Sequence, residues 1–301
     1  MIWILIVGCI LLALVLLYFG FGYIFLAKFF RRSKKPLKFK DNLGEKYDFS
    51  PDLDWLTSPD KEDLSYPWGK KLQRARLIPY HGSHKYLICI HGFKGSFGAH
   101  SRMNKALANA LKANALLLVL RGDKESDWSY CSLGNKECED LLRWIDFIKK
   151  RDPEARFYIW GVSMGAAISI FASDHYGPEV LGVVADSGFG NLQEQMDDLF
   201  RARLHGLAPF FEFPVKLAYQ SHFLVPMDQH TDAALKHTHT PFFFIHGEKD
   251  TFVLPKNFHH NLELDPSPSW FIKDCPHAVG DVVDKDEYFD KVSRFFLGLK
   301  D

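Results

Sequence analysis

The chain has 301 residues, of which 47% are hydrophobic and 25% are charged, and its formal net charge at neutral pH is zero. This length is enough for one large α/β domain with a sizeable core, or for two small domains. No long basic or acidic block occurs beyond residue 40, so the chain offers little to neutralise a run of phosphates, and nucleic acid is not an expected partner.

The N-terminal segment is expected to be a membrane helix. No charged side chain occurs from Ile2 to Ala27. At about 1.5 Å per residue the segment covers roughly 39 Å, enough to cross a hydrocarbon core of about 30 Å with some tilt. The start MIW is not basic and no A-x-A-like site follows, unlike a cleaved signal peptide. We therefore predict an uncleaved, single-pass membrane helix over residues 1–28.

A basic cluster follows this helix. Its members are Lys28, Arg31, Arg32, Lys34, Lys35, Lys38 and Lys40. Basic flanks of a span tend to stay in the cytoplasm, so the cluster predicts that the rest of the chain is cytoplasmic. A cluster lying on anionic headgroups and a plain solvated linker are alternatives. Residues 29–68, which also contain Pro51, Pro59 and Pro67, are expected to form a basic linker and an irregular lead-in.

From residue 69 onwards, short apolar runs alternate with amphipathic stretches. The expected strands are 86–90, 115–120, 156–160, 180–185, 241–246 and 269–273, and the expected helices are 99–112, 135–150, 164–175, 255–263 and 285–299. Apolar strands separated by helices indicate a mostly parallel sheet with helices on both faces. We expect residues 69–301 to form this α/β domain.

Residues 188–235 interrupt the alternation, because they are too long for a simple connection between two strands. The segment is rich in aromatic and aliphatic side chains: Phe189, Phe200, Leu204, Leu207, Phe210, Phe211, Phe213, Tyr219 and Phe223. We expect a helical lid over a pocket, although an additional packing layer would have the same composition.

The sequence Gly161-Val162-Ser163-Met164-Gly165 lies between an expected strand and an expected helix. This is the G-x-S-x-G pattern in the strand–turn–helix context that it requires. The turn presents the Ser163 hydroxyl above the sheet at a helix N-terminus, where backbone N–H groups point at developing negative charge. Ser163 is therefore the expected nucleophile.

Two backbone N–H groups are expected to form an oxyanion hole. One belongs to Met164, the residue after the nucleophile. The other belongs to Phe93 in His91-Gly92-Phe93, which follows the expected strand 86–90. An ordinary glycine-containing turn is the alternative explanation of that loop.

A serine nucleophile needs a base, and the base needs a carboxylate to orient it. His277 follows the strand 269–273 and precedes the last helix, so it is the expected base. Asp250 follows the strand 241–246 and is the expected acid. Asp186, after the strand 180–185, is the rival for that position. The chain order Ser, acid, His agrees with Asp250.

These motifs resemble those of the α/β-hydrolase superfamily. The resemblance rests on HGF (91–93), RGDKES (121–126), GVSMGA (161–166), HGEKD (246–250) and PHA (276–278), and spans roughly residues 70–298. More narrowly, the set resembles bacterial hydrolases with an N-terminal membrane segment, near serine aminopeptidases of the S33 type. It implies the same catalytic set, Ser163, Asp250 and His277, with Phe93 and Met164 as oxyanion donors. Three positions depart from the usual pattern: Asp123 occurs in place of a histidine, Lys124 in place of a glycine, and Pro276 in place of another glycine.

The expected activity is hydrolysis of an ester, thioester or amide through an acyl-enzyme, acting on a small or acyl-bearing molecule. Acyl transfer on the same triad and an inactive, membrane-tethered binding module are the alternatives. No cofactor is expected. The pairs His237/His239 and His259/His260 have no carboxylate or cysteine at ligand spacing, so no metal is expected. The five cysteines match no zinc pattern and are expected to be free thiols.

Overall fold

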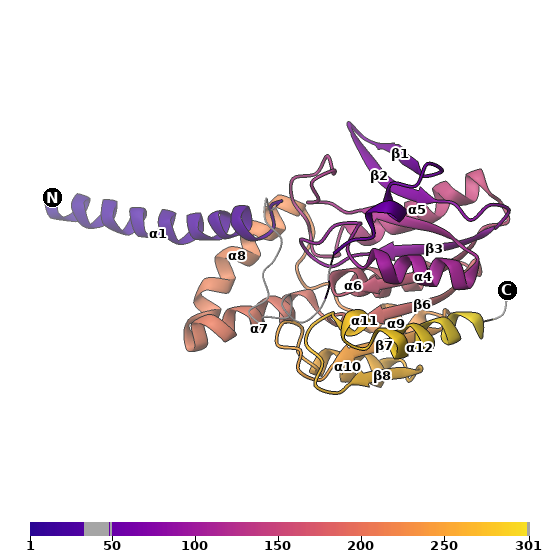
Figure 1. The fold of residues 1–301 in the computed structure, drawn as a ribbon. Helices are drawn as coiled ribbons and strands as arrows, with labels where there is room; N and C mark the ends of the chain where they lie inside the picture. Colours follow the sequence, from indigo (N-terminus) through magenta and orange to yellow (C-terminus); the bar gives the residue numbers. More distant parts are fainter. Residues whose placement is uncertain (33–47, 49, 300–301) are drawn as a thin grey trace. The chain divides into compact units, whose positions relative to one another are not determined.

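The computed structural model describes residues 1–32, 48 and 50–299, and these divide into two compact units (Figure 1). The helical unit contains Met1–Arg31 and Asn191–Gln229. The sheet unit contains Arg32–Gly190 and His230–Asp301. The basic residues Lys34, Lys35, Lys38 and Lys40 lie outside the described residues.

The sheet unit is built on eight strands in the order β1-β2-β4-β3-β5-β6-β7-β8. Their bounds are β1 Glu62–Trp68, β2 Lys71–Ile78, β3 Lys85–Ile90, β4 Asn114–Val119, β5 Arg156–Val162, β6 Val180–Asp186, β7 Phe242–Gly247 and β8 Ser269–Ile272. From β4 to β8 along this order all pairs are parallel. The structure thus confirms the mostly parallel sheet and each of its six predicted strands.

The prediction of an irregular lead-in up to residue 68 was wrong for its last part. Residues 62–68 form β1, which pairs antiparallel with β2, a strand that the sequence analysis also missed. A two-residue turn joins them, with Gly69 at a φ of 60°. The sequence signal that was available is the alternation of Ala75 and Leu77, which are buried in β2, with the arginines before them. Pro67 argued against a strand, yet it is tolerated because β1 is an edge strand.

Helices cover both faces of this sheet, as predicted. On one face lie α4 (Ser101–Leu111) and α12 (Lys285–Leu297), whose buried side chains pack on alternate residues of the central strands (Figure 1). On the other lie α5 (Glu137–Arg151), α6 (Met164–Phe171), α9 (Asp232–His237) and α10 (Lys256–Leu264). Short elements complete the unit: α3 (Leu53–Leu56), α11 (Gly280–Val283) and a 3₁₀ turn at Ser173–His175.

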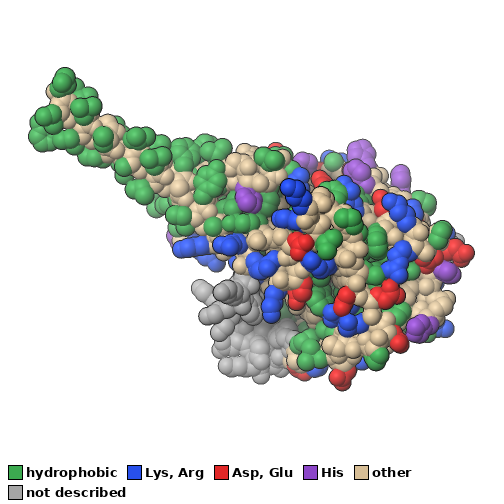
Figure 2. All heavy atoms as spheres, turned by 90° about the horizontal axis from the view of Figure 1, so that it is seen from above, with side chains coloured by type: hydrophobic (Ala, Val, Ile, Leu, Met, Phe, Trp, Pro, Cys, Tyr) green, Lys and Arg blue, Asp and Glu red, His purple; other side chains and the backbone are tan. Residues whose placement is uncertain are grey.

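The helical unit contains α1 (Ile2–Phe29), α7 (Leu192–Leu204), a 3₁₀ turn at His205–Leu207 and α8 (Ala208–Phe223). Apolar side chains cover α1 (Figure 2), and by length and composition it is a candidate membrane span. Asn191 caps α7 by accepting from the Glu194 N–H. Residues 191–229 of the expected lid therefore belong to a unit with α1, whereas 188–190 and 230–235 belong to the sheet unit.

Candidate active site

Ser163 lies at a sharp turn between β5 and α6. Its backbone has φ 56° and ψ −116°, a conformation that a non-glycine residue adopts only under constraint. The Ser163 N–H donates to the Asp186 carbonyl oxygen at 2.7 Å, which ties the turn to the end of the neighbouring strand β6. The serine is thereby held at the carboxyl edge of the sheet, the edge at which ligands bind in open α/β sheets.

The two glycines of the pattern are required by close backbone approaches. A Cβ at Gly161 would lie 2.3 Å from the Gly165 carbonyl oxygen, and a Cβ at Gly165 would lie 2.0 Å from that of Ile90. Both distances are far below a normal contact. The chain can make this turn, and α6 can lie against β3, only because these positions have no side chain.

Backbone contacts bring the loops after β7 and β8 together. The Lys249 N–H donates to the Cys275 carbonyl oxygen at 2.9 Å. A Cβ at Gly247 would lie 2.5 Å from the carbonyl oxygen of Pro276, so the backbones of the two loops touch directly. Asp250 and His277 therefore face each other because of local backbone geometry, and proline replaces the usual glycine at 276 without separating the loops.

Ser163, His277 and Asp250 form a continuous hydrogen-bonded chain. His277 Nε2 lies 2.8 Å from Ser163 Oγ, and His277 Nδ1 lies 2.6 Å from Asp250 Oδ2. A carboxylate can only accept, so the imidazole proton is on Nδ1 and Nε2 accepts from the serine hydroxyl. All three residues are buried. With the proton on Nδ1, the lone pair of Nε2 is available to accept the serine proton.

The surroundings of Asp250 keep it ionised. Burial opposes its charge, but the electrostatic attraction of His277 and hydrogen bonds from His246 and His277 together outweigh that penalty and lower the Asp250 pKa to about 2. Its other oxygen accepts from the N–H groups of Phe252 and Val253, each at 2.9 Å. His246, whose part in the site the sequence analysis missed, donates from Nε2 to the Val253 carbonyl oxygen at 2.9 Å.

Asp186, the rival acid, points into a different network. Ser187 Oγ and the Tyr288 hydroxyl each donate to its carboxylate at 2.8 Å, and Trp160 Nε1 donates to the same tyrosine at 3.0 Å. Burial raises the pKa of Asp186, in contrast to that of Asp250. Its contacts are those of a buried carboxyl group that connects β6 to α12 and β5.

Met164 directly follows Ser163, and Phe93 directly follows Gly92, whose backbone lies beside the serine. Met164 is the first residue of α6, where an N–H group has no acceptor within its own helix. The loop after β3 runs beside the serine: a Cβ at Gly92 would lie 3.6 Å from Ser163 Oγ and 3.2 Å from its Cβ. The loop after β3 and the start of α6 thus both lie beside the Ser163 hydroxyl.

Comparison with known proteins identifies the fold family of the chain. A sequence profile described as "alpha/beta hydrolase fold" matches residues 85–236, about half of the chain. The chain belongs to the α/β-hydrolase fold family. No protein of curated function matches it significantly in sequence.

Solved structures of this family are similar in fold. The esterase Pf2001 of Pyrococcus furiosus has a TM-score of 0.65 at 20% identity, over 89% of this chain and 99% of that chain. Est1E of Butyrivibrio proteoclasticus has a TM-score of 0.58 at 16% identity, over 78% and 98%. The meta-cleavage product hydrolase CumD of Pseudomonas fluorescens has a TM-score of 0.54 at 16% identity, over 78% and 97%.

Asp123, the first departure from the family pattern, has a structural partner. Its Oδ2 lies 2.8 Å from His91 Nε2 and accepts from the Leu120 N–H at 2.7 Å. His91 Nδ1 lies 2.8 Å from the Gly92 carbonyl oxygen. Burial lowers the His91 pKa, but the charge and hydrogen bond of Asp123 outweigh it and raise the pKa overall. This buried pair braces the loop that carries Phe93, a role that the sequence analysis did not identify.

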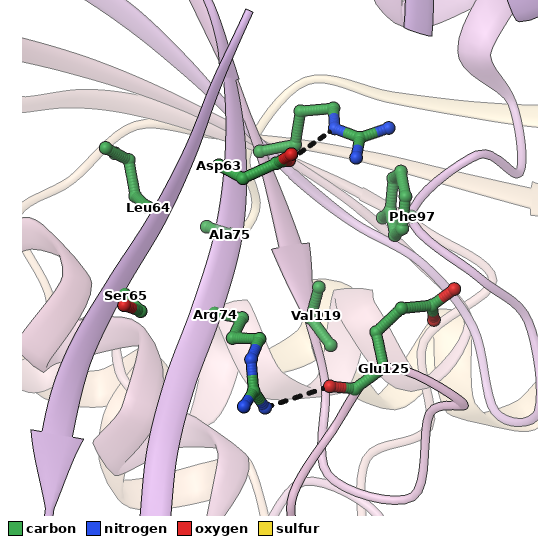
Figure 3. Close-up of a pocket in the computed structure, with 9 residues that line it drawn as sticks. Asp63, Leu64, Ser65, Arg74, Ala75, Phe97, Val119 and Glu125 are labelled. Atoms are coloured by element: carbon green, nitrogen blue, oxygen red, sulfur yellow. Dashed lines mark hydrogen bonds and ion pairs between the residues drawn. The ribbon is translucent and has the colours of Figure 1, made fainter. Parts of the chain in front are cut away.

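A pocket of about 480 Å³ lies elsewhere in this unit (Figure 3). Its lining comes from β1, β2, β4 and two loops: Asp63, Leu64, Ser65, Arg74, Ala75, Arg76, Phe97, Val119 and Glu125. Arg76 Nε pairs with Asp63 at 2.7 Å, and Arg74 Nη1 donates to the Glu125 carbonyl oxygen at 3.0 Å. Its arginines are already engaged, and it contains none of the three residues of the hydrogen-bonded chain.

Proposed function

We propose that this protein is a membrane-tethered serine hydrolase that cleaves an ester, thioester or amide through an acyl-enzyme. The observation that carries the proposal is the chain of short contacts from Ser163 Oγ through His277 to Asp250, at 2.8 and 2.6 Å. Its order and proton positions are those that nucleophilic catalysis by a serine requires. The family to which the chain belongs is consistent with this chemistry.

In the first half of the reaction, Ser163 Oγ attacks the acyl carbon while His277 Nε2 accepts the hydroxyl proton. The N–H groups of Phe93 and Met164 donate to the oxygen that becomes negative. Asp250 stabilises the imidazolium that forms, and its low pKa keeps it ionised for this purpose. His277 then returns the proton to the leaving oxygen, sulfur or nitrogen, and the acyl group remains on Ser163.

In the second half, water gives a proton to His277 and attacks the acyl-enzyme, and the acid is released as Ser163 regains its proton. Another acceptor in place of water would make the same site an acyltransferase. The leaving group is the alcohol of an ester, the thiol of a thioester or, by the resemblance to serine aminopeptidases, the amine of an aminoacyl amide.

The substrate class follows from the apolar elements of the chain. Helix α1 supplies the tether, and the basic residues after it favour a cytoplasmic catalytic unit. The insertion 188–235 leaves the sheet directly after β6, whose last residue bonds to the Ser163 N–H. We assign it a role in selecting an apolar or acyl-bearing substrate, as a lid would.

A fluorophosphonate probe followed by a substrate panel tests this function. The probe should label Ser163 in the full-length protein in detergent, and His277→Ala should abolish the labelling. The panel should contain acyl esters of graded length and aminoacyl amides, each with and without an alcohol acceptor. A folded protein that neither reacts with the probe nor turns over any member would favour the binding-module alternative.

A further inference from the structure

Helix α8 and the residues that flank it carry a row of exposed apolar side chains. The row consists of Leu207, Phe210, Phe213, Leu217 and Leu224, which are 64, 58, 56, 44 and 85% exposed. Phe210, Phe213 and Leu217, at intervals of three and four, lie on one side of α8, and Leu207 and Leu224 flank its two ends. The charged side chains of α8 point elsewhere, since Lys216 Nζ donates to Gln193 Oε1 of α7 at 2.6 Å and Glu212 lies beside Asp197 of α7. Contiguous apolar surface of this kind indicates a binding surface.

The contacts of α8 with α1 are suited to an environment poor in water. Pro214 lies inside α8 and has no N–H, so the Phe210 carbonyl oxygen, four residues earlier, loses its helical donor. The Tyr18 hydroxyl of α1 donates to this oxygen at 2.8 Å. A second contact joins the hydroxyl groups of Tyr23 and Ser221 at 2.9 Å. In hydrocarbon, neighbouring helices must supply such donors, because no water is present to do so.

The two helices also approach each other closely. A Cβ at Gly22 would lie 2.0 Å from the Pro214 carbonyl oxygen, so the backbones touch at this point. A small residue at the crossing point is typical of helices that pack within membranes. Beside the crossing, the ring centroids of Phe21 and Phe211 are 5.0 Å apart. Helix α8 thus continues the apolar surface of α1.

The residues of α1 that contact α8 indicate how deep α8 would lie in a membrane that α1 crosses. A hydrocarbon core of about 30 Å needs roughly 20 residues of helix, which from Ile2 extends to about Phe21. Residues 2–17 of α1 are exposed throughout, and contact with α8 begins at Tyr18. The start of α8 meets α1 at Tyr18, near the end of that span, and the later part of α8 meets α1 at Tyr23, just past it, which places α8 at the edge of the hydrocarbon core.

We propose that α8 is an interfacial membrane helix, with its exposed row immersed in the outer part of the acyl chains while α1 crosses the bilayer. The lipid bilayer is the occupant of this surface because the row is continuous with α1, the candidate span. The proposal rests on the tether assigned to α1 above. It makes residues 208–223 a second membrane contact beside α1.

Environment-sensitive labels on single cysteines test this proposal in vesicles of phosphatidylcholine containing brominated acyl chains. Cys9 in α1 is the natural reference, because it is exposed and Cys89, Cys131, Cys138 and Cys275 are buried. In a Cys9→Ala background, Phe213→Cys and Leu217→Cys report on the row. Glu194→Cys, on an exposed position of α7 in the same unit, is the matched control.

We expect the brominated lipid to quench labels at positions 9, 213 and 217 at least several-fold more than the label at 194. Quenching at position 9 without quenching at 213 and 217 would overturn the assignment of α8 while leaving the tether intact. Absence of quenching at position 9 would overturn the tether itself. Cross-linking between copies through position 217, without quenching there, would give the row to a second copy of the chain and would also overturn the proposal.

Discussion

The two units of this protein differ in how many large apolar side chains they expose. Large apolar side chains that are exposed among the described residues of the sheet unit are few: Leu53, Leu72, Tyr80, Phe271 and Leu297. The helical unit exposes most of α1 and the row on α8. The surface of the sheet unit therefore has few large apolar side chains, whereas the helical unit exposes the apolar surface that suits a lipid environment.

The units also differ in how their polar groups are used. In the sheet unit, buried polar side chains such as Asp250, His246 and His277 bond to one another at the sheet edge. In the helical unit, the Tyr18 and Tyr23 hydroxyls serve to join two helices. The proposed chemistry and the proposed membrane attachment thus lie in separate parts of the chain, and each can be tested by itself.

The largest expected effect is that of Ser163→Ala. Removing the nucleophile should lower kcat by on the order of 10⁶-fold, while the melting temperature and membrane association stay unchanged. Steady-state kinetics on the best ester, with thermal unfolding of the same preparation, measures both. Retention of more than a few per cent of the activity in clean protein would show that Ser163 is not the nucleophile.

Asp250→Asn should follow, with a loss in kcat of roughly 10⁴-fold, because an amide does not hold the correct His277 tautomer. Asp186→Asn is the matched control, since it is also a buried carboxylate near the end of a strand but bonds to Ser187 and Tyr288. That change should mainly lower stability. A reversed order of the two rate effects would make Asp186 the acid.

Gly22→Ala tests the helical unit in the same manner. The added methyl group would collide with Pro214, so α8 should separate from α1, whereas Gly20→Ala, two residues earlier, meets nothing within 4 Å. We expect Gly22→Ala to make residues 191–229 several-fold more sensitive to protease in detergent, with kcat on a short ester unchanged. Equal sensitivity of the two variants would mean that the crossing contributes nothing to holding α8.

The smallest expected effect is on the acid stability of the sheet unit. The folded-state pKa of Asp250 is lowered to about 2, so its ionisation stabilises the fold above about pH 4, and that stabilisation is lost as pH falls towards 2. The contribution is about 2 kcal/mol. Urea unfolding from pH 5 to pH 2 should show a shallower loss of stability for Asp250→Asn than for the unchanged protein. Parallel curves would contradict the low pKa.

The sequence by itself determined the sheet strands from β3 to β8 and the edge at which Ser163, Asp250 and His277 meet. Each strand is a local apolar run, and parallel strands bring the residues that follow them to one edge. The G-x-S-x-G pattern places glycines at 161 and 165, and the structure shows the carbonyl oxygens that a side chain at either position would meet.

Only the tertiary structure decided what has no local signature. The bond between His91 and Asp123 joins loops 32 positions apart, and that between Tyr18 and Phe210 spans 192 positions. Composition showed that residues 188–235 were apolar but could not say what they would pack against. Their partner was decided by the close approach of α8 to Gly22 and by a carbonyl oxygen that Pro214 leaves without a donor. Such contacts depend on where two distant helices meet, which no single stretch of sequence encodes.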